Sequence, residues 1–228
     1  MFKGLTLKLK GLRVEPVSFD PAALGDDHAA CTQWGAAKGG GASFRTHRLV
    51  EVDPTRTEFR ATRGAVVFYS IFLGIGLAVM VGFTVATLTL DASGEFPLIA
   101  PVLFGLIFTG VGGGLLYFGT APMVFVKRRG EYWKGRVAPY EAGSHRALKH
   151  YADLDRIHAL QIISEHCRSK NSSYYSYELN LVLDDATRMN VIDHGSLEQM
   201  RRDAERLAVF LGKPVWDATA LPPSTSTP

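Results

Sequence analysis

The chain has 228 residues, of which 46% are hydrophobic, and its formal net charge is +3 at pH 7. So small a charge excludes the strongly basic surface with which nucleic-acid-binding proteins contact phosphates, and we expect no nucleic-acid partner. The two cysteines, Cys31 and Cys167, lie far apart in the sequence without the spacing of a metal site. No disulfide is expected between them in a reducing compartment.

Residues 1–63 predict an N-terminal cytoplasmic segment of short strands and loops. Leucines alternate with polar residues at positions 5–10, which favours a strand that either joins a later sheet or lies on the membrane surface. The glycine run 39–41 lacks the lysine and Ser/Thr ending of a phosphate-binding loop and is interpreted as a flexible tether. Alternation returns on both sides of a turn at Asp53-Pro54, which predicts a short hairpin resting on the later domain or on lipid headgroups.

Two long apolar runs follow, at about residues 64–90 and 96–121, and neither contains Asp, Glu, Lys, Arg or His. Each run exceeds the roughly 20 helical residues needed to cross the hydrocarbon core of a bilayer. Residues 64–126 therefore predict a transmembrane helical hairpin, whose short link at 91–95 makes the two helices antiparallel neighbours. The lack of ionisable side chains argues against an ion pathway or redox site within the membrane, so we interpret the hairpin as an anchor.

The charges that flank the two runs predict the orientation of the hairpin. The link is acidic, whereas basic residues precede the first run and follow the second, so both termini are expected in the cytoplasm of a multi-pass inner-membrane protein. The bilayer is thus the first expected partner. Basic residues near the membrane exits are candidates for binding anionic lipid, although topology alone would also explain them. These candidates are Arg63, Lys127, Arg128, Arg129 and Lys134, with Arg136 nearby.

Small residues recur every four positions in both runs. Such spacing lets two helix backbones approach closely within a bilayer. The predicted packing residues are Gly74, Ala78 and Gly82 in the first run and Gly105, Thr109 and Gly113 in the second. We expect these stripes to pack the two helices against each other, and homodimerisation through a glycine face is the alternative.

Residues 123–217 predict a second cytoplasmic region made of strands and one helix, followed by a disordered tail at 218–228. Alternating patterns predict strands at 124–127, 131–135, 157–163, 175–183 and 188–192. In the strand 175–183, Ser176, Glu178 and Asn180 are expected on the open face of an antiparallel sheet with one packed face. An amphipathic helix at 197–211, with a capping box at Ser196 and Gln199, is expected to cover the packed face.

This layout resembles a known family. The segments that carry the resemblance are Phe125–Gly135, Ile157–Ile163, Glu178–Leu183 and Ala204–Val215. Together with the hairpin, they resemble bacterial two-span membrane proteins with a C-terminal pleckstrin-homology-like (PH-like) domain, and the layout is similar to that of the photosystem I assembly factor family. The resemblance covers residues 64–217 and implies an α+β membrane protein, in which a PH-like antiparallel sheet or barrel is capped by a C-terminal helix. It supports a fold better than a function.

Candidate chemistry is sparse. A hydrolase site could be drawn from Cys167, His194 and Asp193, but adjacent Asp and His residues do not normally orient each other as a triad requires. A metal site could be drawn from His158, His166 and His194, which lack any recognised ligand spacing. We therefore predict no catalytic residue, no metal and no cofactor.

The remaining candidate is an aromatic patch formed by Tyr174, Tyr175 and Tyr177, residue types that favour protein interfaces. The alternative is that Tyr175 and Tyr177 belong to the sheet core and the neighbouring serines to a loop. The sequence thus favours a non-enzymatic scaffold, assembly factor or inhibitory binding protein acting on another membrane protein. An anionic-lipid sensor is the first alternative, and a membrane-bound hydrolase using Cys167 or His194 is the second.

Overall fold

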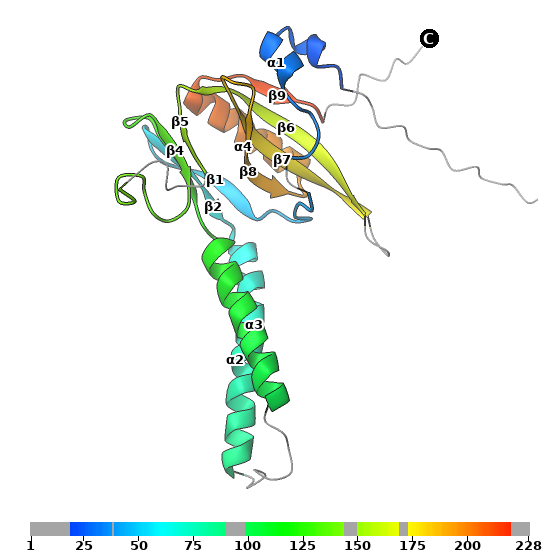
Figure 1. Cartoon of the computed structure of the whole chain (residues 1–228), viewed down its shortest axis with the longest axis vertical. Helices are drawn as coiled ribbons and strands as arrows, with labels where there is room; N and C mark the ends of the chain where they lie inside the picture. Colours follow the sequence, from blue (N-terminus) through cyan, green and yellow to red (C-terminus); the bar gives the residue numbers. More distant parts are fainter. Residues whose placement is uncertain (1–18, 38, 90–98, 144–149, 169–172, 220–228) are drawn as a thin grey trace, which may run out of the picture.

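The computed structural model describes residues 19–37, 39–89, 99–143, 150–168 and 173–219. A β-rich domain sits at one end of two long helices that leave it side by side (Figure 1). The α+β class predicted from the sequence is confirmed. The strand predicted at residues 5–10, the acidic link at 91–95 and the end of the tail beyond residue 219 lie outside the described residues.

The two helices are α2 (Arg63–Thr89) and α3 (Ile99–Phe118), close to the predicted bounds, and we call them the helical hairpin. Both are long and apolar enough to cross a membrane. Only 11% of the most apolar 18-residue window of each helix is buried in the structure. The described part of the chain therefore leaves most of their apolar surface uncovered.

The first sheet of the β-rich domain is an antiparallel meander with the strand order β1-β2-β3-β4-β5. Its strands are β1 (His47–Asp53), β2 (Arg56–Ala61), β3 (Met123–Val126), β4 (Glu131–Lys134) and β5 (Tyr151–Asp153). β2 pairs with β3, so that Phe59 lies opposite Met123 across the ladder. The helical hairpin is thus inserted between two neighbouring strands.

This pairing corrects the predicted domain boundaries. The N-terminal strands are part of the domain and not a separate segment, because Leu49 and Phe59 belong to the same buried core as Phe125. The domain, hereafter the β-domain, comprises residues 19–62 and 122–219 in the described part of the chain, and the predicted unit 123–217 lacks two of its strands.

The second sheet has the order β8-β7-β6-β9, with β9 running parallel to β6 and the other pairs antiparallel. Its strands are β6 (Ile157–Arg168), β7 (Ser173–Leu183), β8 (Arg188–His194) and β9 (Val215–Asp217). Between β8 and β9 the chain forms α4 (Leu197–Leu211). Gly212 ends α4 in the left-handed conformation, with a φ of 69°, and its N–H donates to the Ala208 carbonyl.

The core lies between the two sheets and α4. Met200, Ala204 and Leu207 of α4 are fully buried and belong to the same cluster as Leu160 and Leu179 of the second sheet. Burying a large apolar side chain contributes about 1.5–3 kcal/mol, so this stripe fixes α4 on the sheet as predicted. The predicted capping box is wrong: the Ser196 side chain makes no capping bond, and the Gln199 amide oxygen accepts from Arg45.

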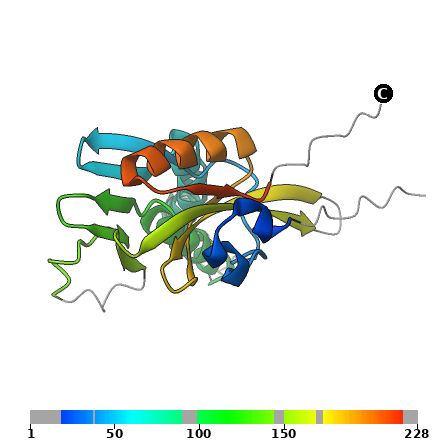
Figure 2. The ribbon, with the colours of Figure 1, turned by 90° about the horizontal axis from the view of Figure 1, so that it is seen from above.

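The other face of the second sheet is also covered. The short helices η1 (Pro21–Leu24) and α1 (Asp27–Cys31), in a region predicted as loop, lie across the sheet from α4 (Figure 2). Ala29 and Trp216 are buried together there, and the Trp34 ring packs 5.9 Å from that of Trp216. The prediction that only one face of this sheet is packed is therefore wrong.

Both inner ends of the helical hairpin are tied to the β-domain. Thr62 precedes α2; its hydroxyl accepts from the Ala65 N–H at 3.1 Å, and its own N–H donates to the Thr46 carbonyl at 2.9 Å. At the end of α3, the Arg136 guanidinium donates to the Thr120 hydroxyl at 2.6 Å and to the Tyr117 carbonyl at 3.4 Å. A cation at a helix C-terminus satisfies free carbonyl groups and the helix dipole, so Arg136 fastens α3 to the sheet.

Only some of the predicted packing residues lie between α2 and α3. Gly105 and Thr109 lie in the contact as predicted, because a Cβ on Gly76 would approach the Gly105 carbonyl to 2.7 Å and would also strike Thr109. Another close approach is at Gly112, against the backbone of Leu73. Gly74, Gly82 and Gly113 have no such neighbour, and Ala78 and Gly82 line a shallow groove on the outer side of α2.

Candidate functional site

The longest strands form a projecting ribbon. β8 pairs with β7 only from Tyr177 to Val182, and β9 pairs with β6 only at residues 160–162. Residues 164–168 and 173–176 therefore extend past the rest of the sheet as a two-stranded unit, which we call the ribbon. Its outer end points to the side of the β-domain from which the helical hairpin leaves (Figure 1).

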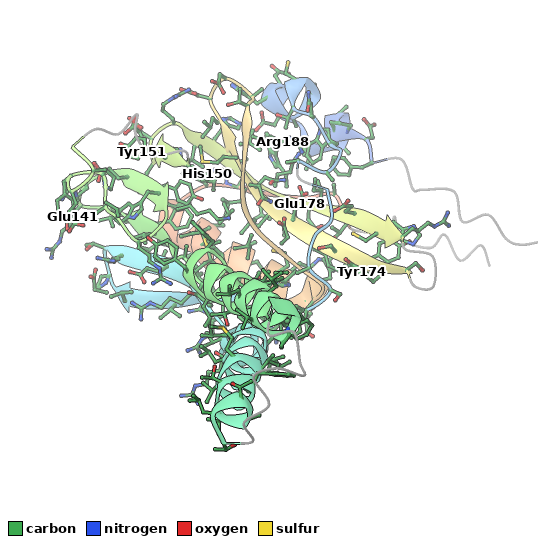
Figure 3. All side chains as sticks on the ribbon, turned by 60° about the horizontal axis from the view of Figure 1, so that its bottom comes forward. Glu141, His150, Tyr151, Tyr174, Glu178 and Arg188 are labelled. Carbon is green, nitrogen blue, oxygen red and sulfur yellow. The ribbon has the colours of Figure 1, made fainter. Side chains whose placement is uncertain are left out.

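The ribbon separates the three tyrosines of the predicted partner-binding patch. Tyr175 is 54% exposed, and its ring stacks on His166 with 4.8 Å between ring centroids. Tyr174, labelled near the outer end of the ribbon in Figure 3, donates its hydroxyl to the Gly41 carbonyl at 2.9 Å. Tyr177 packs against the core. Tyr174 is still 36% exposed but has its hydroxyl tied to Gly41, so Tyr175, paired with His166, offers the more open aromatic surface.

The polar face of β7 is buried, contrary to the sequence-based expectation. Ser176, Glu178 and Asn180 are fully buried beneath residues 33–37 and 39–43, which we call the strap. The strap is bound through its backbone. The Glu178 carboxylate accepts from the Ala37 N–H at 2.9 Å, and the Ser176 hydroxyl donates to the Ala42 carbonyl at 3.1 Å.

Further contacts of the same kind run along the strap. The Arg188 guanidinium donates to the Gly35 carbonyl at 2.7 Å, and Figure 3 shows Arg188 and Glu178 on the same sheet. The Glu165 carboxylate accepts from the N–H groups of Gly40 and Gly41 at 3.1 and 3.3 Å. Hydrogen bonds to charged groups contribute about 1.5–3 kcal/mol each when protected from water.

The glycine run is therefore not the flexible tether that the sequence predicted. A Cβ on Gly41 would meet the Ser176 side chain, so glycine is required for the close approach of the strap to β7.

A second polar feature is a groove of about 440 Å³ on the first sheet, which we call the arginine groove. It lies beside Pro122, close to the end of α3, and its charged lining consists of Arg56, Glu58, Arg60, Arg129, Arg136 and Glu141. The Glu58 carboxylate is buried between Arg56 and Arg60, each at 2.6 Å, and Arg129 lies over the Tyr140 ring at 4.3 Å. The lining has four guanidinium groups against two carboxylates, and Arg129 also pairs with Glu131 at 3.1 Å just outside the lining, so the groove keeps a small excess of positive charge.

The predicted lipid-binding residues are scattered by the fold. Arg63 is the first residue of α2, at the inner end of the helical hairpin, and Arg129 lines the arginine groove. Lys127 and Arg128 follow the end of β3 that is remote from α3, and Lys127 lies 4.6 Å from the centre of the Phe210 ring. Lys134 donates to the Val191 carbonyl at 3.0 Å, inside the β-domain. The sequence could not reveal the groove because β1–β2 and β3–β4 are separated by the hairpin.

The structure does not assemble the two chemical sites considered from the sequence. Cys167 lies opposite Tyr174 and His194 opposite Tyr177, three residues along β7, which corresponds to about 10 Å. His158 and His166 are eight residues apart on β6, or roughly 26 Å. His194 is instead a buried residue whose Nδ1 accepts from the Ser196 N–H at 3.2 Å, and burial lowers its pKa to about 4.

Comparison of the chain with protein-family models, with curated proteins and with solved structures found no match. The functional assignment therefore depends on the geometry of the ribbon, the strap and the arginine groove.

Proposed function

We propose that this chain is a non-enzymatic inner-membrane protein that holds its β-domain against the cytoplasmic face of the bilayer, as a scaffold, assembly factor or inhibitor of a neighbouring membrane protein. The observation that carries the proposal is the ribbon, which projects from the β-domain toward the hairpin side and exposes the His166–Tyr175 pair. Aromatic side chains of this kind supply large contact area at interfaces.

Membrane insertion is supported by the exposed apolar surface of the helical hairpin, which water would not tolerate over such an area. The pairing of β2 with β3 supports the predicted topology, because both ends of the hairpin join one sheet and so leave the bilayer on the same side. The basic residues near the inner helix ends favour the cytoplasm for that side.

The proposal keeps the resemblance to PH-like domains. It is supported by an antiparallel five-stranded meander, a second antiparallel meander of β6, β7 and β8, and α4 packed directly after them. The helical hairpin would then be an insertion between two strands of the first meander.

The partner that fits the ribbon is an extended segment of another membrane protein close to the bilayer surface. Over residues 164–168, the outer edge of β6 has no strand beside it among the described residues. Such an edge accepts an added strand through backbone hydrogen bonds, while adjacent side chains supply specificity. His166 and Tyr175 would provide that side-chain contact.

A photo-crosslinking amino acid at Tyr175 tests the proposal in native membranes. We expect a discrete adduct with one membrane protein at Tyr175, and none at Val209, which is 84% exposed on α4 and serves as the matched control. Substitution of His166 by Ala should weaken the adduct. Labelling of lipid alone, or equal labelling from both positions, would contradict partner binding through the ribbon.

The arginine groove supports a second candidate function, the binding of an anionic lipid headgroup. Its position next to the end of α3 and its excess of guanidinium groups favour a phosphate ligand.

The whole chain must be tested for lipid binding, because residues 123–217 alone lack β1 and β2. We expect the double variant Arg60→Gln/Arg129→Gln to retain less phosphatidylglycerol after detergent purification, measured by mass spectrometry. The control is Arg202→Gln, which changes an exposed side chain on the outer face of α4. Equal lipid retention by the wild type, the double variant and the control would refute headgroup binding in the groove.

A further inference from the structure

A cluster of two histidines and one aspartate joins α1 to the second sheet. Asp26, His28 and His158 each offer one ligand atom, and these three atoms all lie within 4.8 Å of one another. The Asp26 carboxylate precedes α1, His28 lies in α1, and His158 lies near the start of β6. Two elements from distant parts of the chain, α1 with its N-cap residue Asp26 and β6, thus direct metal-ligating groups to one point.

The position of His158 is set by an irregularity in the sheet. The register between β6 and β7 shifts between Ile157 and Ala159, so that His158 occupies a bulge. Bulges re-aim a side chain and are frequent at binding sites. Here the bulge brings His158 Nε2 to 2.7 Å from Asp26 Oδ2.

His28 is oriented by a contact on its far side. Its Nε2 lies 3.1 Å from the Asp184 carbonyl oxygen, a contact that requires Nε2 to carry the proton. The lone pair is then on Nδ1, which lies 3.8 Å from Asp26 Oδ1. Metal-binding histidines are typically held in this way, with the second ring nitrogen donating to a backbone carbonyl or a carboxylate.

From this geometry we infer that Asp26, His28 and His158 form a binding site for a divalent transition metal, with Zn²⁺ as the best match. Two imidazole nitrogens and one carboxylate oxygen suit Zn²⁺ and its first-row neighbours, whereas Ca²⁺ and Mg²⁺ prefer oxygen ligands throughout. Water would complete the tetrahedron.

The ion would replace the proton that His158 Nε2 donates to Asp26 Oδ2, and this proton would be released to solvent on binding. The side chains then need only a small adjustment to close on the ion. Ligand atoms around tetrahedral zinc lie about 3.3 Å apart, given bond lengths of about 2.0–2.1 Å. The two imidazole rings are stacked with 4.1 Å between centroids, and small side-chain rotations would turn Nδ1 of His28 and Nε2 of His158 toward a shared ion. The side chains of His28 and His158 are 42% and 30% exposed, which leaves room for the rotation and a path for the ion.

The consequence of metal binding would be local. α1 leads directly into the strap. An ion shared by α1 and β6 would therefore fix the chain just before the strap, while the hydrogen bonds to Glu178 and Glu165 hold the strap itself. Metal would thereby protect the strap from opening.

The experiment uses the whole chain, purified in detergent, freed of any histidine tag and stripped with a chelator. Titration with Co²⁺, followed by visible absorption, should give the bands of tetrahedral coordination at one equivalent, and Zn²⁺ should displace them. Asp26→Asn keeps a residue that caps a helix well, so it tests the charge and not the fold. We expect Asp26→Asn and His28→Ala each to weaken Zn²⁺ binding by about 100-fold or more, since even outer partners of metal sites cost about 10–100-fold.

The control variant is His166→Ala, which removes an exposed histidine from the ribbon and should bind Zn²⁺ as the wild type does. Absence of stoichiometric binding by the wild type would overturn the inference. Unchanged affinity in Asp26→Asn and His28→Ala would also overturn it, because the ion would then sit elsewhere. Hydrogen exchange of residues 33–43, slowed by Zn²⁺ in the wild type and not in His28→Ala, would establish the link to the strap.

Discussion

Replacing Gly112 by Leu is expected to separate the two helices of the hairpin. Gly112 lies against the backbone of Leu73 on α2, where even a Cβ would stand 2.6 Å from the Leu73 Cα. A backbone atom cannot rotate away as a side chain can, so the helices must move apart and lose their other close contacts. Overpacking typically costs about 1–3 kcal/mol, and we expect the upper end of that range here.

The adjacent residue provides the matched control. Gly113 has nothing within 4 Å, so Gly113→Leu adds the same side chain to the same helix without a clash. Spin labels at Leu77 and Leu106, which are both exposed, should report a longer and broader distance distribution only in Gly112→Leu. A distribution unchanged in both variants would show that the observed glycine contact does not set the helix packing.

Acidification between about pH 6.5 and pH 4 is expected to destabilise the β-domain. His47 in β1 and His194 in β8 are buried, and burial lowers the pKa of each from its ordinary 6.5 to about 4. The positive charge of Lys134 lowers the pKa of His47 further, and Arg45 and His47 do the same for His194. In the described structure, the Nε2 atoms of both histidines lack a hydrogen-bond partner, so the folded state favours neutral rings.

The sign follows from proton linkage. Within this window the unfolded chain binds protons at both histidines while the folded chain does not. The contribution of the two histidines to the free energy of unfolding is therefore fully present above pH 6.5 and falls as the pH drops toward 4. The slope reaches at most about 1.4 kcal/mol per pH unit for each histidine. The carboxyl groups of Asp184 and Asp185 have pKa values below their ordinary 3.8, so their contribution is lost only at still lower pH.

Urea unfolding followed by tryptophan fluorescence at several pH values measures this slope. Asn places an amide oxygen near the position of Nδ1 and can still accept from the Ser196 N–H, which makes His194→Asn the appropriate variant. The double variant His47→Asn/His194→Asn should have a nearly flat profile between pH 4 and 6.5, even if its overall stability is lower. A profile as steep as that of the wild type would show that other groups cause the acid sensitivity.

The sequence was most informative where one segment determines its own structure. The uncharged runs that became α2 and α3 and the amphipathic stripe of α4 are local patterns, and each produced the expected helix. Most strands of the second sheet were found by alternation, although β6 continues to Arg168, well past the predicted end. The polar residues of its outer half weaken the apolar signal.

What the sequence could not provide were contacts between distant segments. Ser176, Glu178 and Asn180 have the alternation of a solvent-facing surface. Ser176 and Glu178 instead bind the backbone of a strap more than 130 positions earlier, and Asn180 bonds Gln161, Glu178 and Asn190 within the sheet. Backbone groups carry no sequence signal. The cluster of Asp26, His28 and His158 was also missed, because the sequence suggests neither the helical turn at His28 nor the bulge at His158.

The glycine pattern failed in a different way. Several small residues occur on both helices, and spacing of four identifies a stripe without stating which side of the helix meets its neighbour. Gly76 and Gly112 occupy the contact, whereas Gly74 and Gly113 face outward.

The insertion of the helical hairpin between β2 and β3 imposes an order on the biogenesis of the molecule. During synthesis β1 and β2 emerge first, but the strand that pairs with the free edge of β2 appears only after some 60 further residues, both apolar helices included. With the helices inserted in the bilayer as proposed, the first sheet cannot close until both have been delivered there and the chain has returned. Completion of the β-domain would report that membrane integration has succeeded, and a chain that stalls between the two helices would display the unpaired edge of β2 to the quality-control machinery of the cell.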